Sequence, residues 1–219
     1  MSLVARLRAL DTGAVSDALD RLSLRGTVHG LHALSGRGRI GGRVVTVRLV
    51  AGEPSQAGPH LGTSAIEAAE PGDIVVVEHR QRDDCAGWGG ILSTAAKTRG
   101  LSGTIVDGLA RDIDESRDED YPVFARGAVP TTARGRVHEQ AFNVEVSIGG
   151  VPVRPGDYAI ADASGVVFVS SDSIERVLEA AESIAAKERA MAKAVREGRR
   201  VSQVMGGDYE TMLEGNEHE

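Results

Sequence analysis

The fold of this chain is decided by residues 74–108, which read IVVVEHRQRDDCAGWGGILSTAAKTRGLSGTIVDG. The continuous apolar run at 74–77 is typical of a strand that is buried on both faces. A polar loop follows at 79–89, a helix is expected from about Gly90 to Arg99, and Thr104-Ile105-Val106 is expected to form a second apolar strand. A strand, a helix and a strand with short connections form a βαβ unit. The sequence therefore predicts an α/β fold in which these two strands are parallel.

The N-terminal third is expected to supply two helices and one strand. The first helix is expected around Val15 to Leu24, and a glycine-punctuated, β-branched strand is expected from Gly36 to Val50. Ser64-x-x-Glu67 has the pattern of a capping box, so a second helix is expected to begin there and to stop at Pro71-Gly72.

The C-terminal part is expected to hold short strands followed by one long helix. The strands are expected at residues 122–125, 144–148, 158–161 and 166–170. Asp172-x-x-Glu175 is expected to cap the helix, and six apolar residues recur there at helical spacing: Ile174, Val177, Leu178, Ala181, Ile184 and Ala185. The charged half from Glu188 to Arg200 is expected to be solvated or to pack on another subunit. No linker or internal repeat divides the chain, so we expect one domain over residues 1–219.

Composition argues against several classes of protein. The 25 basic residues are outnumbered by 32 acidic ones and are spread along the chain, which argues against a nucleic-acid or anionic-membrane surface as the main partner. Cys85 is the single cysteine, so neither an internal disulfide nor a CxxC zinc site is available, as suits a reducing cytoplasm. Charged residues interrupt the start, and no run approaches the ~18 apolar residues of a membrane span. We therefore expect a cytoplasmic protein.

The chemistry is expected at the carboxyl ends of the two parallel strands, where ligands gather in open α/β sheets. The loop after the first strand ends in Gly87-Trp88-Gly89-Gly90 at a helix start, where free N–H groups and the helix dipole favour an anion. The second strand leads to Arg111, which can hold a carboxylate or phosphate, and to Asp112, which can take a hard divalent cation. Such a cation could polarise a carbonyl of the same bound anion.

The other polar residues near this edge are expected to have structural roles. Cys85 precedes the helix start, but no histidine is placed in the sequence as its base, so packing is expected. Asp112 to Asp120 is strongly acidic, and beyond Asp112 we expect a solvated, mobile flap. Five histidines lack metal-ligand spacing and are expected on the surface or in loops: His29, His32, His60, His79 and His138. Of these, His79 is expected to lie nearest the site.

With these residues identified, the sequence resembles the RraA-like family. This family contains the 4-hydroxy-4-methyl-2-oxoglutarate/4-carboxy-4-hydroxy-2-oxoadipate aldolases and the RraA inhibitors of ribonuclease E. The motifs that carry the resemblance are VSDALD at 15–20, PGDIVVV at 71–77, AGWGGIL at 86–92, GTIVDGLARD at 103–112, PVFARG at 122–127 and GGVPVRPGD at 149–157. The resemblance implies a layered β/β/α swivelling-type domain that assembles as a trimer or a pair of trimers.

For this chain the resemblance to the aldolases implies a class II, metal-dependent, pyruvate-specific reaction. The helix-start amides that hold the pyruvate carboxylate map onto Gly89, Gly90, Ile91 and Leu92. Arg111 would bind substrate and Asp112 would ligate Mg²⁺ or Mn²⁺, which polarises the 2-keto group and stabilises an enolate as the C–C bond breaks. The expected function is thus a lyase on a small 2-keto acid such as 4-hydroxy-4-methyl-2-oxoglutarate, with oxaloacetate decarboxylation as a further activity. A non-catalytic, protein-binding regulator of a ribonuclease is the alternative.

One position departs from the aldolase pattern. That pattern has an acidic residue separated by twenty residues from the Arg-Asp pair, and in this chain the position is Gly90. Asp83 or Asp84, in the same loop, could reach inward as substitutes. A different 2-keto acid or a different reaction is the other interpretation of this departure.

Overall fold

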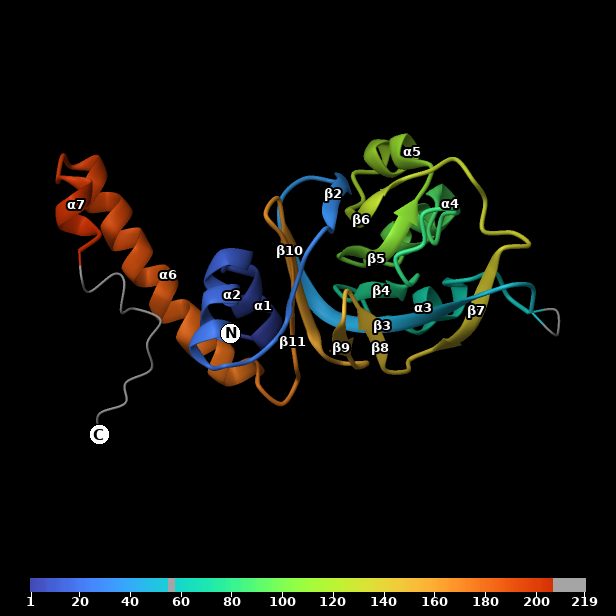
Figure 1. Cartoon of the computed structure of the whole chain (residues 1–219), viewed down its shortest axis with the longest axis horizontal. Coiled ribbons are helices and arrows are strands. Elements are labelled where there is room, and N and C mark those ends of the chain that lie inside the picture. The colour runs from blue at the N-terminus through green and yellow to red at the C-terminus, as the bar shows by residue number, and fades with distance from the viewer. Residues whose placement is uncertain (55–57, 207–219) are drawn as a thin grey trace.

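The computed structural model describes residues 1–54 and 58–206, which form a mixed α/β fold around a nine-stranded sheet (Figure 1). The helices are α1 (Leu3–Arg8), α2 (Thr12–Arg21), α3 (Thr63–Ala68), α4 (Gly90–Thr98), α5 (Ile113–Asp118), α6 (Ile174–Arg196) and α7 (Val201–Val204). The strands are β1 (Thr27–Val28), β2 (His32–Ser35), β3 (Ile40–Ala51), β4 (Ile74–Glu78), β5 (Gly103–Ala110), β6 (Val123–Ala128), β7 (Val137–Phe142), β8 (Val146–Ile148), β9 (Val151–Val153), β10 (Tyr158–Asp162) and β11 (Gly165–Val169).

The predicted βαβ unit is present as β4, α4 and β5. Strand β4 pairs in parallel with β5, with Ile74 opposite Gly103, and every residue of β4 is buried. Strands β3 and β6 also run parallel to their neighbours β4 and β5, so four strands end at the same edge of the sheet. That edge is where the sequence places the candidate site.

Strand β3 connects two parts of the sheet that pack face to face. Its first residues pair antiparallel with β10, whereas the following residues pair in parallel with β4. Between the two parts lies an apolar core that includes Val76 and Phe124 on one side and Val166 and Phe168 on the other. Helices α3 and α4 cover the outer face of the parallel part, which gives the expected β/β/α layers. Helices α1, α2 and α6 form an additional layer over β10 and β11 (Figure 1).

Helix α6 confirms the predicted apolar face, because all six apolar residues of the pattern are buried. Its C-terminal half runs away from the sheet together with α7 (Figure 1), and the apolar side chains of Val195, Val201 and Met205 are exposed there. Although α6 has 23 residues, no helix in the described ranges combines the length and apolar character needed to cross a membrane.

Both predicted capping boxes are wrong. Helix α3 begins at Thr63, and the preceding Gly62 donates its N–H to Glu139 Oε2 (N···O 2.7 Å). Helix α6 begins at Ile174 after Ser173, with no side-chain cap bond. These helix starts are set by contacts with distant segments and by packing, which local sequence does not show.

The acidic side chains beyond Asp112 are exposed to solvent as predicted, but the segment is a helix and not the predicted mobile flap. Residues 113–118 form α5, and Ser116 is buried, with its Oγ 2.8 Å from Ser93 Oγ on α4. The buried Ser116 and the packing of α5 against α4 give this stretch a helical structure, which its charged residues alone do not indicate. Helices α1 and α7 and strands β1, β2, β7 and β9 were not predicted, and the strand expected over 36–50 is β3, which starts at Ile40.

Candidate functional site

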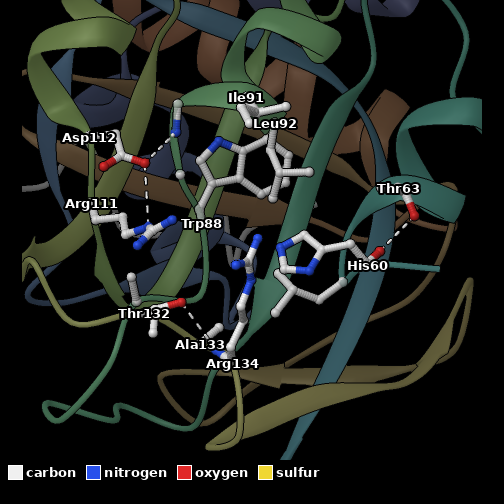
Figure 2. A pocket seen from close by; sticks show the side chains of 14 residues that line it. His60, Thr63, Trp88, Ile91, Leu92, Arg111, Asp112, Thr132, Ala133 and Arg134 are labelled. Atoms are coloured by element: carbon white, nitrogen blue, oxygen red, sulfur yellow. Dashed lines mark hydrogen bonds and ion pairs between the residues drawn. The ribbon is translucent and has the colours of Figure 1, made fainter. Parts of the chain in front are cut away.

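A cavity of about 290 Å³ opens at the carboxyl ends of the parallel strands. Two walls enclose it. The motif wall consists of residues 88–92 and 111–112, and the loop wall consists of residues 60–63 and 132–134 (Figure 2). Every residue placed in the site from the sequence lies on the motif wall: Gly89, Gly90, Ile91, Leu92, Arg111 and Asp112.

The start of helix α4 forms the upper part of the motif wall. Gly89 is its N-cap and contributes no side-chain bond, and Gly90 N–H donates to Asp112 Oδ2 (N···O 3.1 Å). The N–H groups of Ile91 and Leu92 belong to the first turn, where a helix supplies no intrahelical acceptor. The predicted anion-binding site therefore has fewer free N–H groups than expected, because the Gly90 N–H already donates to the Asp112 carboxylate.

Arg111 and Asp112 lie side by side, with Arg111 Nε 3.3 Å from Asp112 Oδ2 (Figure 2). Asp112 has left-handed backbone angles (φ 55°, ψ 42°), which are uncommon for a residue other than glycine but are tolerated by aspartate. A Cβ at position 89 would lie 2.9 Å from Asp112 Oδ2, so the glycine there lets the carboxylate approach the start of α4. The turn at Asp112 thus brings a carboxylate and a guanidinium to the helix start.

Trp88 fixes the position of the motif wall. Its ring is buried and its Nε1–H donates to Ser93 Oγ (N···O 3.0 Å), which in turn lies 2.8 Å from Ser116 Oγ. Arg111 N–H donates to Trp88 O (N···O 3.0 Å). These bonds join the starts of α4 and α5, so the site's polar groups are held by buried hydrogen bonds.

His79 lies in the loop directly after β4, as expected, but it is buried beneath the motif wall and does not lie on the surface. Its ring fills the space beside Gly87 and Gly108: a Cβ at position 87 would lie 2.9 Å from ring atom Cγ, and a Cβ at position 108 would overlap ring atom Cδ2. His79 Nε2 lies 2.8 Å from Cys85 O, whereas Nδ1 has no partner within residues 1–54 and 58–206. Burial lowers the pKa of His79, which is therefore neutral at pH 7 and supports the loop without reaching the cavity.

The acidic and thiol side chains of the same loop do not enter the cavity. Cys85 is buried in the core, and burial raises the pKa of its thiol, in agreement with a packing role. Asp84 is paired with Arg82 (Nε···Oδ1 2.8 Å), and this hydrogen bond lowers the pKa of Asp84 to about 2. Neither Asp83 nor Asp84 lines the cavity, so the structure does not support either as a substitute for the acid missing at position 90.

His60 and Arg134 on the loop wall were missed by sequence reasoning. The Arg134 side chain extends between Trp88 and His60 (Figure 2), so the loop wall adds a second guanidinium to the cavity. Partial burial lowers the pKa of His60, and the positive charges of Arg134 and Arg111 lower it further. Both residues lie in loops that follow β3 and β6. The rule that ligands gather at carboxyl strand ends would have found them, had all four strands been known to be parallel.

The donor set limits which metal ion the site could hold. In the described part of the chain, no three His, Cys, Asp or Glu side chains form a cluster that could bind a metal. Mg²⁺ usually takes one or two carboxylates and completes its shell with water. Asp112, with a carboxylate at the cavity, fits such a cation, whereas a zinc site with several protein ligands does not fit.

Comparison with known proteins agrees with this geometry. Residues 12–168 match the RraA-like family, described as Aldolase/RraA. A protein of Halalkalibacterium halodurans named "Putative 4-hydroxy-4-methyl-2-oxoglutarate aldolase" is 32% identical over 198 residues, with 89% of each chain covered. Protein DlpA of Legionella pneumophila is 27% identical over 92% of this chain, which spans only 33% of the length of DlpA.

A solved structure agrees over nearly the whole chain. An uncharacterized protein from Pseudomonas syringae pv. tomato superimposes with a TM-score of 0.85 at 30% identity, covering 94% of this chain and 97% of that one. The matched range includes both walls of the cavity and the sheet edge on which they stand. The chain is therefore a member of the RraA-like family.

Proposed function

We propose that this protein is a carbon–carbon lyase that uses a divalent metal ion, Mg²⁺ or Mn²⁺, to cleave small 2-keto acids that carry a second carboxylate. The observation that carries the proposal is the motif wall, where Arg111, Asp112 and the first-turn N–H groups of α4 face one cavity. Relatives named as 4-hydroxy-4-methyl-2-oxoglutarate aldolases support the same reaction class. Oxaloacetate belongs to the same substrate class, and its decarboxylation would leave the same pyruvate-derived anion.

The motif wall offers groups for the reacting end of such a substrate. The N–H groups of Ile91 and Leu92 would donate hydrogen bonds to the carboxylate next to the keto group, because a helix start favours an anion. The Arg111 guanidinium would hold that carboxylate or the keto oxygen with charge-assisted hydrogen bonds. Asp112 would hold the divalent cation, which when bound supplies an electrophile for the keto oxygen.

The loop wall offers groups for the far end of the substrate. Arg134 and His60 on this wall line the same cavity as Arg111. The cavity therefore offers a second guanidinium besides Arg111 for a second carboxylate, which favours 2-keto dicarboxylates over pyruvate itself. As the bond between the two halves breaks, charge develops on the keto oxygen, and the groups of the motif wall lie where they would stabilise it.

The test follows pyruvate release with lactate dehydrogenase and NADH. Purified protein is mixed with 4-hydroxy-4-methyl-2-oxoglutarate or oxaloacetate and with Mg²⁺ or Mn²⁺, and reactions without protein correct for spontaneous decarboxylation. Asp112→Asn should abolish release. Asp114→Asn should not, because Asp114 pairs with Arg117 on the surface (Nη1···Oδ1 2.8 Å). Absence of metal-dependent pyruvate, or equal rates for wild type and Asp112→Asn, would refute the proposal.

The same resemblance leads us to propose assembly as a homotrimer or a pair of trimers. The exposed apolar side chains at the end of α6 and on α7 support a contact between subunits. Light scattering after size exclusion measures the mass directly. If the assembly forms and inhibits a ribonuclease while no substrate yields pyruvate, the regulator would replace the lyase as the better interpretation.

A further inference from the structure

One hydrogen bond from a distant strand holds the start of the loop wall. Glu139 lies on β7, which pairs antiparallel with β3 (Figure 1), and its Oε2 accepts the Gly62 N–H (N···O 2.7 Å). Gly62 is the N-cap of α3, and a helix supplies no intrahelical acceptor for the N–H groups at its start. In the described part of the chain, Glu139 is the only residue outside 60–66 that forms a hydrogen bond with residues 60–62.

This bond acts on a turn that packs on the motif wall. Gly62 has a left-handed backbone (φ 80°), which glycine adopts without strain. A Cβ at position 62 would lie 3.2 Å from Trp88 Cζ3, so the backbone of the turn lies close to the Trp88 ring. Within the turn, His60 O accepts hydrogen bonds from the N–H and the Oγ1–H of Thr63 (Figure 2). The turn that carries His60 is therefore held between the carboxylate and the ring.

Glu139 lies behind the loop wall and does not line the cavity of the candidate site. It lines a second cavity of about 550 Å³, which shares His60 and Arg134 with the first. Burial lowers the pKa of His60, as do the charges of Arg134 and Arg111, whereas the Glu139 carboxylate raises it. Glu139 is thus a neighbour of the loop-wall residues that does not face the bound substrate, as expected for a residue that positions others.

We propose that Glu139 is the positioning residue of the loop wall. Through its bond to Gly62 it holds the turn of His60 next to Trp88, and so it sets the width of the cavity in which the second carboxylate would bind. The part of this inference that concerns the substrate rests on the proposed function. Because the bond lies away from the reacting end of the substrate, its loss should weaken binding more than it slows bond cleavage.

Three variants at position 139 separate the hydrogen bond from the charge. Glu139→Gln keeps the length of the side chain and an oxygen that can accept the Gly62 N–H, but it removes the charge. Glu139→Asp keeps the charge but is one methylene shorter and should lose the bond, whereas Glu139→Ala removes both. Gln140→Ala is the matched control, because Gln140 is the exposed neighbour on β7. Circular dichroism melts confirm that each variant is folded.

The first measurement is acrylamide quenching of tryptophan fluorescence in the intact purified protein. Trp88 is the single tryptophan and is 2% exposed, so its emission reports on the turn that packs against it. The quenching constant should rise about 2-fold or more in Glu139→Ala and Glu139→Asp, because the turn opens locally. It should stay near the wild-type value in Glu139→Gln and Gln140→Ala.

The second measurement is the split between KM and kcat in pyruvate release from oxaloacetate. Glu139→Ala and Glu139→Asp should raise KM about 3- to 10-fold and change kcat less than about 2-fold, and Glu139→Gln should keep KM near the wild-type value. Unchanged quenching or an unchanged KM in Glu139→Ala and Glu139→Asp would overturn the inference. The reverse pattern, with Glu139→Asp like wild type and Glu139→Gln like Glu139→Ala, would also overturn it, because the effect would then come from the charge.

This inference and the proposed function can fail separately. If the wild type releases no pyruvate while Glu139→Ala and Glu139→Asp still expose Trp88, only the lyase is refuted, and Glu139 still positions the turn. If the wild type releases pyruvate while these variants keep wild-type quenching and KM, only the role of Glu139 is refuted.

Discussion

The two walls of the cavity differ in how they are built. The motif wall is fixed by buried hydrogen bonds through Trp88, Ser93 and Ser116 and rests on the buried ring of His79. The loop wall is held by a bond to strand β7, from Gly62 N–H to Glu139 Oε2, and by a bond between two loops, from Ala86 N–H to Thr131 O (N···O 3.0 Å). If the proposed function holds, we expect the chemistry on the motif wall and the recognition of the far end of the substrate on the loop wall.

The largest effect is expected from removing the carboxylate of the motif wall. Asp112→Asn should lower kcat/KM for pyruvate release by about 100-fold or more, because the group that would hold the cation is lost. The measurement is the coupled assay at saturating Mn²⁺. If Asp112→Asn loses no more activity than a loop-wall variant, the proposed division between the walls is wrong.

A change in the packing of His79 beneath the motif wall should affect the stability of the fold more than the activity. Gly108→Ala places a methyl group against the His79 ring and should lower the free energy of unfolding by about 1–3 kcal/mol, measured by urea denaturation. Gly127→Ala is the matched control, because its Cβ would meet only Leu109 Cδ2 at 3.2 Å. Equal losses in both variants would show that the His79 packing has no special role.

A smaller effect is expected from the loop wall. Arg134→Ala should raise KM for 2-keto dicarboxylates about 10-fold and change kcat less than about 2-fold, because it removes binding shared by ground and transition states. Inhibition by pyruvate, which lacks the second carboxylate, should be unchanged. A fall in kcat comparable to that of Asp112→Asn would instead place Arg134 in the chemistry.

The smallest effect is the dependence of stability on pH. The pKa of His79 is lowered by burial, so between that value and about 6.5 the unfolded chain binds a proton that the folded chain does not. The free energy of unfolding should therefore fall as the pH drops below about 6.5. His79→Gln should flatten this dependence more than His60→Gln, because His60 lies on the exposed loop wall. If the free energy of unfolding depends on pH equally in the two variants, the pH dependence cannot be assigned to His79.

Much of the motif wall could be predicted because its signals are local. Glycines at a helix start, an apolar strand before them and an Arg-Asp pair after the next strand identified the edge and its residues, and β4, α4 and β5 were found where the sequence places them. The ordered helix α5 was mistaken for a flap because its charges are local, whereas the bond from Ser116 to Ser93 joins two helices.

By itself, the sequence determined the βαβ unit, the apolar face of α6 and the presence of Arg111 and Asp112 at a strand end, because periodicity and spacing along the chain encode them. Only the tertiary structure decided that Glu115 occupies the space beside Gly90, that His79 is buried beside Gly87 and Gly108, and that Arg134 lines the same cavity as Arg111. The physical reason is that these three facts depend on the order and direction of strands and on the angle at which α5 leaves Asp112. Contacts between segments set these features, and no single segment specifies them.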